Sequence, residues 1–162
     1  MSANHIISVL VENKAGVLAK ISGLFSRRGF NIESLAVGPT DDESTSRITL
    51  VVKAETHSME QVVKQLYKLI NVLKIQELDP ANIVERELVL VKVNADSSTR
   101  AEILEIANIF RANIVDVAKK SLVIEITGTS RKISGIEEML KSYGILELVR
   151  TGKVAINRGS KQ

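Results

Sequence analysis

The order of hydrophobic patterns along the chain constrains its fold more than any other feature. Residues 5–12 are mostly apolar and predict a strand. In the segment that follows, apolar side chains recur at the spacing of one helix face: Val17, Leu18, Ile21, Leu24 and Phe25. A strand therefore leads into an amphipathic helix, which Gly29 ends.

The first half of the chain continues with two strands, a second helix and a last strand, at 30–37, 46–54, 58–70 and 72–78. The second helix is expected to bury Met59, Val62, Val63, Leu66 and Ile70. A polar loop at 38–44 joins the two middle strands into a hairpin. The order βαββαβ is the ferredoxin-like plan, in which two helices cover one face of an antiparallel sheet.

The second half of the chain repeats this plan. Strands are expected at 87–93, 113–118, 121–127 and 145–150, with helices at 99–111 and 130–142. The second of these helices is expected to turn Ile133, Ile136, Met139 and Leu140 inward. Residues 21–37 also resemble residues 106–117, as an internal repeat would.

We therefore predict an α+β protein of two tandem ferredoxin-like βαββαβ domains, with antiparallel sheets and helices on one face. The expected boundaries are 1–78 for the first domain, 79–86 for a linker and 87–162 for the second domain. The polar end at 157–162 is expected to fray. Domains of about 80 residues bury little core alone, which favours an oligomer or a partner.

Composition excludes several classes of protein. The chain has no cysteine, which excludes disulfides, thiolate catalysis and cysteine-based metal sites. No apolar run approaches the roughly 18 residues of a membrane span, and no signal peptide is recognisable at the N-terminus. We expect a cytoplasmic protein without membrane contact, or one of a plastid or mitochondrion if a transit peptide has been removed.

Catalytic, metal-binding and nucleic-acid-binding patterns are weak. His5 and His57 have no metal-ligand spacing and are interpreted as surface or edge residues. RNA-recognition domains share the ferredoxin-like plan, but the strands at 5–12 and 46–54 carry no aromatic side chain on which bases could stack. The net charge of +3 comes from basic residues scattered among 19 acidic ones. We predict no catalytic residue, no metal, no cofactor and no nucleic-acid partner.

Two short segments have the chemistry of a binding site. In ENKAGVL (12–18), Gly16 permits close backbone approach, and the helix start that follows can hold a carboxylate. Asn13 could cap this helix or bind a ligand ammonium. In RRGFNIESL (27–35), Asn31 is polar at an otherwise apolar strand start. On these residues alone, a simple cap and a simple turn remain the favoured interpretations.

Taken together, these segments resemble a known family. Residues 12–52 and 61–75 resemble the ACT domain of the acetolactate synthase (acetohydroxyacid synthase) small subunit, a regulatory protein. The most specific part is RRGFNIESL with the PTDD loop that follows it. Residues 84–93, 109–117 and 150–159 resemble the C-terminal domain of the same family, so the resemblance covers nearly the whole chain.

The resemblance implies a regulatory subunit without an active site of its own. Such a subunit binds the catalytic large subunit, raises its activity and confers feedback inhibition by a branched-chain amino acid, typically valine, with leucine and isoleucine left open. Thiamine diphosphate, Mg²⁺ and FAD are expected on the catalytic subunit and not on this chain. The alternative is a free-standing ACT-type sensor for another partner.

The resemblance also implies where the effector binds. In this family the amino acid lies between two ACT domains of a homodimer. The matching positions are Asn13, Gly16, Val17 and Leu18 in one protomer and Asn31 and Ile32 in the other. Ala36, Gly38 and Gln61 match positions linked to feedback sensitivity, and some family members carry alanine in place of Gly38.

Overall fold

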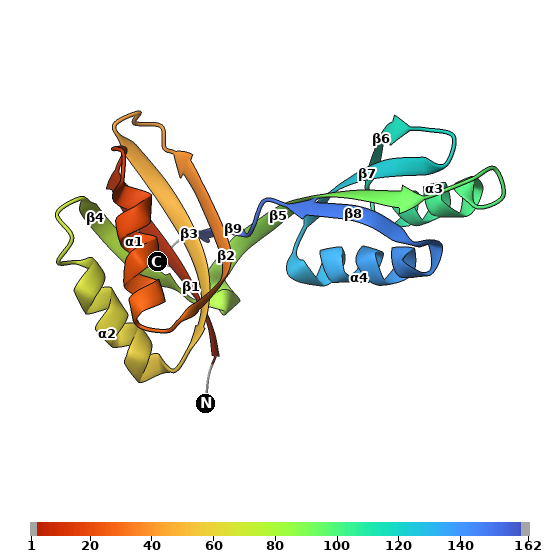
Figure 1. Ribbon diagram of the computed structural model, residues 1–162. Coiled ribbons are helices and arrows are strands. Elements are labelled where there is room, and N and C mark those ends of the chain that lie inside the picture. Colours follow the sequence, from red (N-terminus) through yellow and green to blue (C-terminus); the bar gives the residue numbers. More distant parts are fainter. Residues whose placement is uncertain (1–2, 160–162) are drawn as a thin grey trace. The chain divides into compact units, whose positions relative to one another are not determined.

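The computed structural model describes residues 3–159, which form two compact units (Figure 1). The first unit comprises residues 3–84 together with residues 153–159, and the second comprises residues 85–152. Each unit has its own hydrophobic core. The chain therefore crosses from one unit to the other twice.

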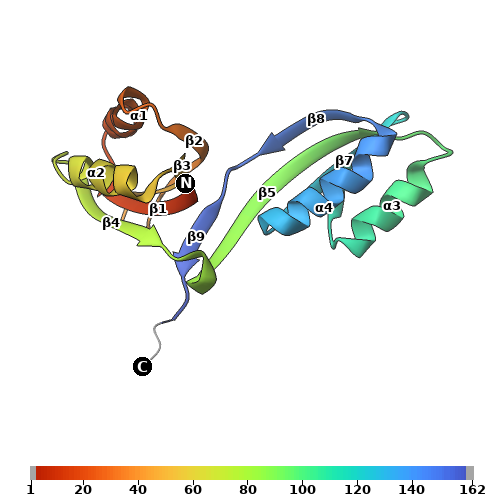
Figure 2. The ribbon, with the colours of Figure 1, turned by 90° about the horizontal axis from the view of Figure 1, so that it is seen from below.

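The first unit has the predicted order of elements. These are β1 (Ala3–Glu12), α1 (Val17–Arg27), β2 (Asn31–Pro39), β3 (Thr45–Ala54), α2 (Thr56–Leu66) and β4 (Val72–Leu78). The sheet is antiparallel in the order β2-β3-β1-β4, so β2 and β4 are its edges. Both helices cover the same face of this sheet (Figures 1 and 2).

Strict alternation along the central strands builds this core. Ile7 pairs with Leu50 and Val9 pairs with Ile48, and all four side chains are buried against α1 and α2. The residues between them on each strand point to the opposite face, as the period of two requires. The first unit therefore has one face under its helices and a second face for other parts of the chain.

The second unit repeats the plan. Its elements are β5 (Ile83–Asn94), α3 (Arg100–Ile109), β6 (Asn113–Val117), β7 (Ser121–Gly128), α4 (Ser130–Leu140) and β8 (Ile145–Arg150). The strand order is β6-β7-β5-β8, and the first two residues of β5 belong to the first unit. Short 3-10 turns lie at Pro80–Asn82 and Lys141–Tyr143. The predicted fold class is confirmed in both halves.

Two expected core residues are exposed. Helix α2 ends at Leu66, and the tight turn after it, with Leu69 N–H donating to Leu66 O, carries Ile70 out to 86% exposure. Met139 lies on α4 beside Leu140, about 100° away around the helix, and is 50% exposed. Both predictions were wrong because helical spacing indicates a face but fixes neither its edge nor the end of the helix.

A further strand, β9 (Val154–Asn157), was missed. The sequence-based boundary 87–162 placed this segment in the second domain, whereas residues 153–159 lie with the first unit. Ala155 is buried with Ile6, Val51, Leu78 and Ile83 on the sheet face opposite the helices. Four residues of alternation indicate a strand but not which sheet it joins. The end predicted to fray includes residues 160–162, which lie outside the described residues.

Candidate functional site

The turn between β1 and α1 presents an open helix start. Gly16 is the N-cap residue, with a left-handed φ of 84°, and among residues 3–159 no side chain caps the helix. A β-carbon added at Gly16 would meet nothing within 4 Å, so the backbone there is accessible. The Val17 N–H donates to the Lys14 carbonyl at 3.5 Å. The N–H groups of Leu18 and Ala19 therefore remain available to an anion, which the helix dipole also favours.

Asn13 anchors this turn to the loop between β2 and β3. Its Nδ2 donates to the Glu43 carbonyl at 3.0 Å, and its backbone N–H donates to the Ser44 carbonyl at 2.7 Å. The side chain therefore does not cap α1. Its Oδ1 accepts no hydrogen bond within the described part of the chain, and an amide oxygen there can accept one from an ammonium group.

The next two predicted residues have different surroundings. Val17 is 4% exposed and belongs to the core, so it holds the helix start in place. Leu18 is 39% exposed and offers apolar surface beside the open N–H groups. The turn thus combines an anion-binding backbone with an exposed aliphatic side chain.

Asn31 and Ile32 lie at the opposite end of the same sheet. Asn31 is paired with Lys53 of β3, whereas Glu12, next to Asn13, is paired with Thr45. Lys53 and Thr45 are eight positions apart on β3, which separates the two asparagines by about 26 Å. Within one chain, Asn13 and Asn31 cannot contact the same small ligand.

The three positions that the resemblance associates with feedback sensitivity do not share one place. Ala36 and Gly38 line a cavity of about 250 Å³ on the sheet face opposite the helices. Gln61 is exposed on α2, 3.4 Å from the ring of His57. A β-carbon at Gly38 would meet nothing within 4 Å, so an alanine would fit there.

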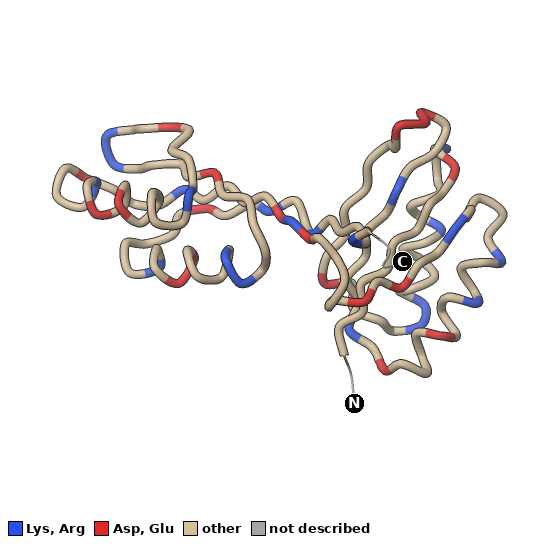
Figure 3. The backbone as a smooth tube through the Cα atoms, turned by 180° about the vertical axis from the view of Figure 1, so that it is seen from behind, with Lys and Arg blue, Asp and Glu red and all other residues tan. Residues whose placement is uncertain are grey.

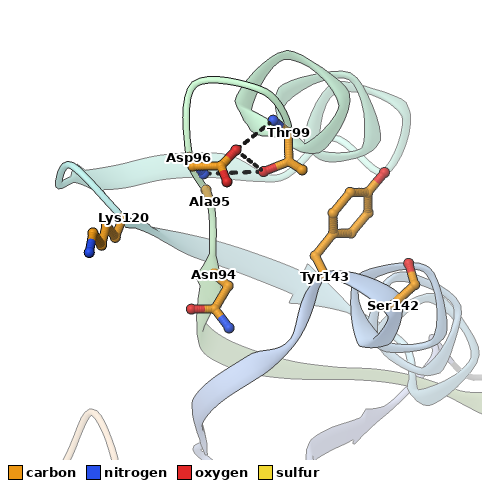
Figure 4. A pocket seen from close by; sticks show the side chains of 7 residues that line it. All are labelled: Asn94, Ala95, Asp96, Thr99, Lys120, Ser142 and Tyr143. Carbon is orange, nitrogen blue, oxygen red and sulfur yellow. Dashed lines mark hydrogen bonds between the residues drawn. The ribbon is translucent and has the colours of Figure 1, made fainter.

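The second unit has an equivalent turn before α3, beside a cavity of about 460 Å³ (Figure 4). Ala95 N–H donates to the Lys120 carbonyl there, as Asn13 N–H does to Ser44 in the first unit. Asp96 Oδ1 accepts hydrogen bonds from the backbone N–H groups of Ser98 and Thr99, at 2.8 and 3.1 Å. The chain's own carboxylate therefore binds N–H groups of the turn that precedes α3, and no described side chain caps the helix itself.

Hydrogen bonds explain the acidity of this side chain. The Ser98 hydroxyl, followed by the Ser98 backbone N–H, stabilises the charged form and holds the pKa of Asp96 below its ordinary value. This role of Asp96 was not predicted from the sequence. The signal was present, because an Asp followed by Ser-Ser-Thr before a helix is typical of a side chain that bonds the backbone ahead of it.

The interpretation of His5 as a surface or edge residue was wrong. His5 is 8% exposed; its Nε2 donates to the Ala54 carbonyl at 3.1 Å, and its Nδ1 bonds the Glu77 carboxylate. It lies inside β1, between β3 and β4, where both neighbours cover the ring. His57 is exposed, as expected.

Other kinds of site lack support in the described residues. Between residues 3 and 159, no group of three or more His, Cys, Asp or Glu could hold a metal ion. No helix of that same span is long and apolar enough to cross a membrane. Basic and acidic residues are interspersed along both units (Figure 3).

Comparisons with known proteins agree with this arrangement. Residues 7–74 match the family model described as the AHAS small subunit-like ACT domain. Residues 86–159 match the model described as the small subunit of acetolactate synthase. Between them the two models cover most of both units.

Individual relatives match over almost the entire chain. The acetolactate synthase small subunit of Mycolicibacterium smegmatis is 54% identical, over 97% of this chain and 92% of its own length. The probable acetolactate synthase small subunit of Archaeoglobus fulgidus is 54% identical, over 98% of this chain and 99% of its own length. The crystal structure of the acetolactate synthase small subunit from Thermotoga maritima is similar, with a TM-score of 0.91 and 42% sequence identity. The match covers 98% of this chain and 99% of that one. The chain therefore belongs to the family of acetolactate synthase small subunits.

Proposed function

We propose that this chain regulates acetolactate synthase. It binds the catalytic large subunit and raises its activity, and it lowers that activity when a branched-chain amino acid, first of all valine, binds to it. Thiamine diphosphate, Mg²⁺ and FAD belong to the large subunit in this proposal. The observation that carries it is the open start of α1 at Gly16, in a chain of this family.

The α1 turn supplies the groups that an amino acid requires. The N–H groups after Gly16 bind the carboxylate, and the exposed part of Leu18 contacts the aliphatic side chain. In the equivalent turn of the second unit, the Asp96 carboxylate binds the N–H groups of Ser98 and Thr99. Its negative charge disfavours a ligand carboxylate there, so the sensor role falls to the first unit. One methylene in such a pocket changes the binding free energy by about 1–3 kcal/mol, so valine, leucine and isoleucine are all included in the test.

A second copy of the chain completes the site. Strand β2 is a sheet edge, so its outer backbone groups can pair with another strand. Leu35 lies midway between Asn31 and Pro39, and two β2 strands paired antiparallel about Leu35 place the partner's Asn31 opposite Pro39. Pro39 lies at the same end of the sheet as the α1 turn, because it is paired with Ser46 and Glu12 with Thr45. Dimerisation thus bridges the distance that separates Asn13 from Asn31 in one chain.

Regulation requires that the ligand distinguish two states of the assembly. An amino acid that binds between two β2 edges favours the arrangement in which these edges are correctly aligned. Amino-acid binding then changes the activity of the large subunit, provided that this activity differs between the aligned arrangement and the ligand-free one.

The test is acetolactate formation by the purified large subunit from the same organism. The rate is measured for the large subunit alone, for the large subunit with this chain, and for both together with valine, leucine or isoleucine. Stimulation that one of these amino acids reverses supports the proposal. Stimulation without any amino-acid response rejects the sensor role, and no stimulation or binding rejects the regulatory role and favours a free-standing sensor.

Variants then test the location of the site. Asn31→Ala is expected to keep stimulation but to raise the valine concentration for half inhibition about tenfold or more, since a hydrogen bond to a charged group is lost. Asn108→Ala, on the exposed side of α3, is the matched control and should respond as the unchanged chain does. An unchanged valine response in Asn31→Ala would remove this residue from the site.

A further inference from the structure

The cavity on the sheet face opposite the helices has the features of a second ligand site. Its volume is about 250 Å³, and it lies entirely within the first unit. Its walls come from β2, β3 and β9: Ala36, Val37, Gly38, Pro39, Arg47, Thr49, Val154 and Ala155. Most of these side chains are small and apolar, and two are polar.

Thr49 is the first polar group in this cavity. It is only 3% exposed, and its side chain has no hydrogen-bond partner among the described residues. Ser8, its neighbour on β1, is also buried but accepts a hydrogen bond from Arg47. Among the described residues, Arg100 Nε is the one enclosed side-chain N or O atom without a partner, so the Thr49 hydroxyl keeps access to the cavity. There it can donate a hydrogen bond to a ligand that offers an acceptor.

Arg47 is the second polar group. It precedes Thr49 by two positions on the same face of β3, and its Nη1 donates to Ser8 Oγ at 2.8 Å. This bond fixes one end of the guanidinium and leaves its other N–H groups for an anion. A guanidinium fork matches a carboxylate, so the charged end of the ligand belongs here.

The cavity walls contain no acidic residue. A ligand ammonium would therefore have no partner in the cavity, and burying it would be unfavourable. A carbonyl next to the carboxylate, in contrast, can accept a hydrogen bond from Thr49. The volume is about eight times the share of one water molecule, which is enough for a branched chain of a few carbons against Ala36 and Val154.

We infer that this cavity binds a small aliphatic carboxylate without an ammonium group, of the 2-oxo acid class. Arg47 holds the carboxylate, Thr49 donates to the oxo group and the aliphatic walls hold the side chain. Because Val154 and Ala155 form one wall, the bound acid also braces β9 against β2. This site lies on the sheet face opposite the helices and binds the carboxylate through Arg47. The proposed amino-acid site lies at the start of α1 and binds it through backbone N–H groups.

The test uses two molecules with the same carbon skeleton, 3-methyl-2-oxobutanoate and valine. Binding of the oxo acid to the full-length chain is measured by calorimetry, with and without saturating valine, and backbone amide shifts locate it. We expect one oxo acid per chain, undiminished by valine, with shifts at Arg47 and Thr49. The assay needs no large subunit, so its outcome is separate from that of the regulatory proposal.

Matched variants make the test specific. Thr49→Val keeps the shape of the side chain but removes the hydroxyl, and should weaken binding about fivefold. Arg47→Gln should weaken it about tenfold or more. Lys53→Gln removes a cation from the same face of β3 but outside the cavity, and should change binding by less than about twofold.

Several results would overturn the inference. One is the absence of binding to the unchanged chain at about 10 mM oxo acid, which corresponds to almost no affinity. Another is equal affinity in Thr49→Val and Arg47→Gln. Displacement of the oxo acid by valine would place it in the amino-acid site instead.

Discussion

The backbone N–H of Lys153 donates a 2.7 Å hydrogen bond to Ser34 Oγ, joining the end of the chain to β2 across 119 positions. Ser34 is half-buried, and it follows the irregularity in the pairing of β2 with β3. The Ser34 hydroxyl on the edge strand β2 thus fixes Lys153, the residue that precedes β9.

Ser34→Ala removes this acceptor and leaves the Lys153 N–H without it. We expect the free energy of unfolding to fall by about 1 kcal/mol, as measured by urea denaturation. Ser26→Ala on the exposed side of α1 is the control and should change it by less than about 0.5 kcal/mol. Equal effects of the two substitutions would mean that the bond to Lys153 adds nothing to stability.

Two glycines close together in sequence should respond in opposite ways to alanine. Gly16 has a φ of 84° and nothing within 4 Å, so Gly16→Ala should destabilise the chain by about 1 kcal/mol through backbone strain alone. Gly23 lies inside α1 with equal space around it, so Gly23→Ala should stabilise by about 0.5–1 kcal/mol. Thermal unfolding of both variants checks this, and shifts in the same direction would contradict it.

His5 should contribute to stability, although it looked like a surface residue. Loss of its bonds to Ala54 and Glu77 in His5→Ala should lower the free energy of unfolding by about 1–3 kcal/mol. His57→Ala, at an exposed position, should have an effect below about 0.5 kcal/mol. Denaturant unfolding at constant pH compares the two, and a similar small loss in both would show that the His5 contacts are weak.

Asp96 should make stability sensitive to acid. Its hydrogen bonds with Ser98 lower its pKa in the folded chain, so the folded state favours the charged carboxylate. The contribution is complete above the unfolded pKa of about 3.9 and is lost as the pH falls through the lower folded value. Unfolding measured between about pH 5 and pH 2 should show a slope that Asp96→Asn reduces. An identical slope in that variant would exclude this contribution.

Sequence patterns predicted both sheets because the buried residues alternate along whole strands, as Ile48, Leu50 and Val52 do. They failed where a contact depends on a distant partner. His5 is buried by Ala54 and Glu77, and Ala155 by Ile6 and Val51, pairs that local periodicity cannot indicate.

The site that we propose for an amino acid was predictable only in part. Gly16 and Asn13 stand close together in sequence and in space, and the turn that they form was recognisable from its residues. One chain holds Asn31 about 26 Å away from them, and it joins them only in the dimer that we propose. The cavity beside Arg47 and Thr49 was not predicted, because one of its walls is β9.

The segment that leads into β9 is held by hydrogen bonds at two closely spaced residues. Thr151 is tied to Leu88 by two hydrogen bonds, of 3.0 and 3.2 Å, and Lys153 is tied to Ser34. Only Gly152, with a φ of 86°, stands between these attachments. The Cα atoms of Thr151 and Lys153 can be at most about 7 Å apart, so Lys153 would stay within that distance of Thr151 even if its bond to Ser34 were broken.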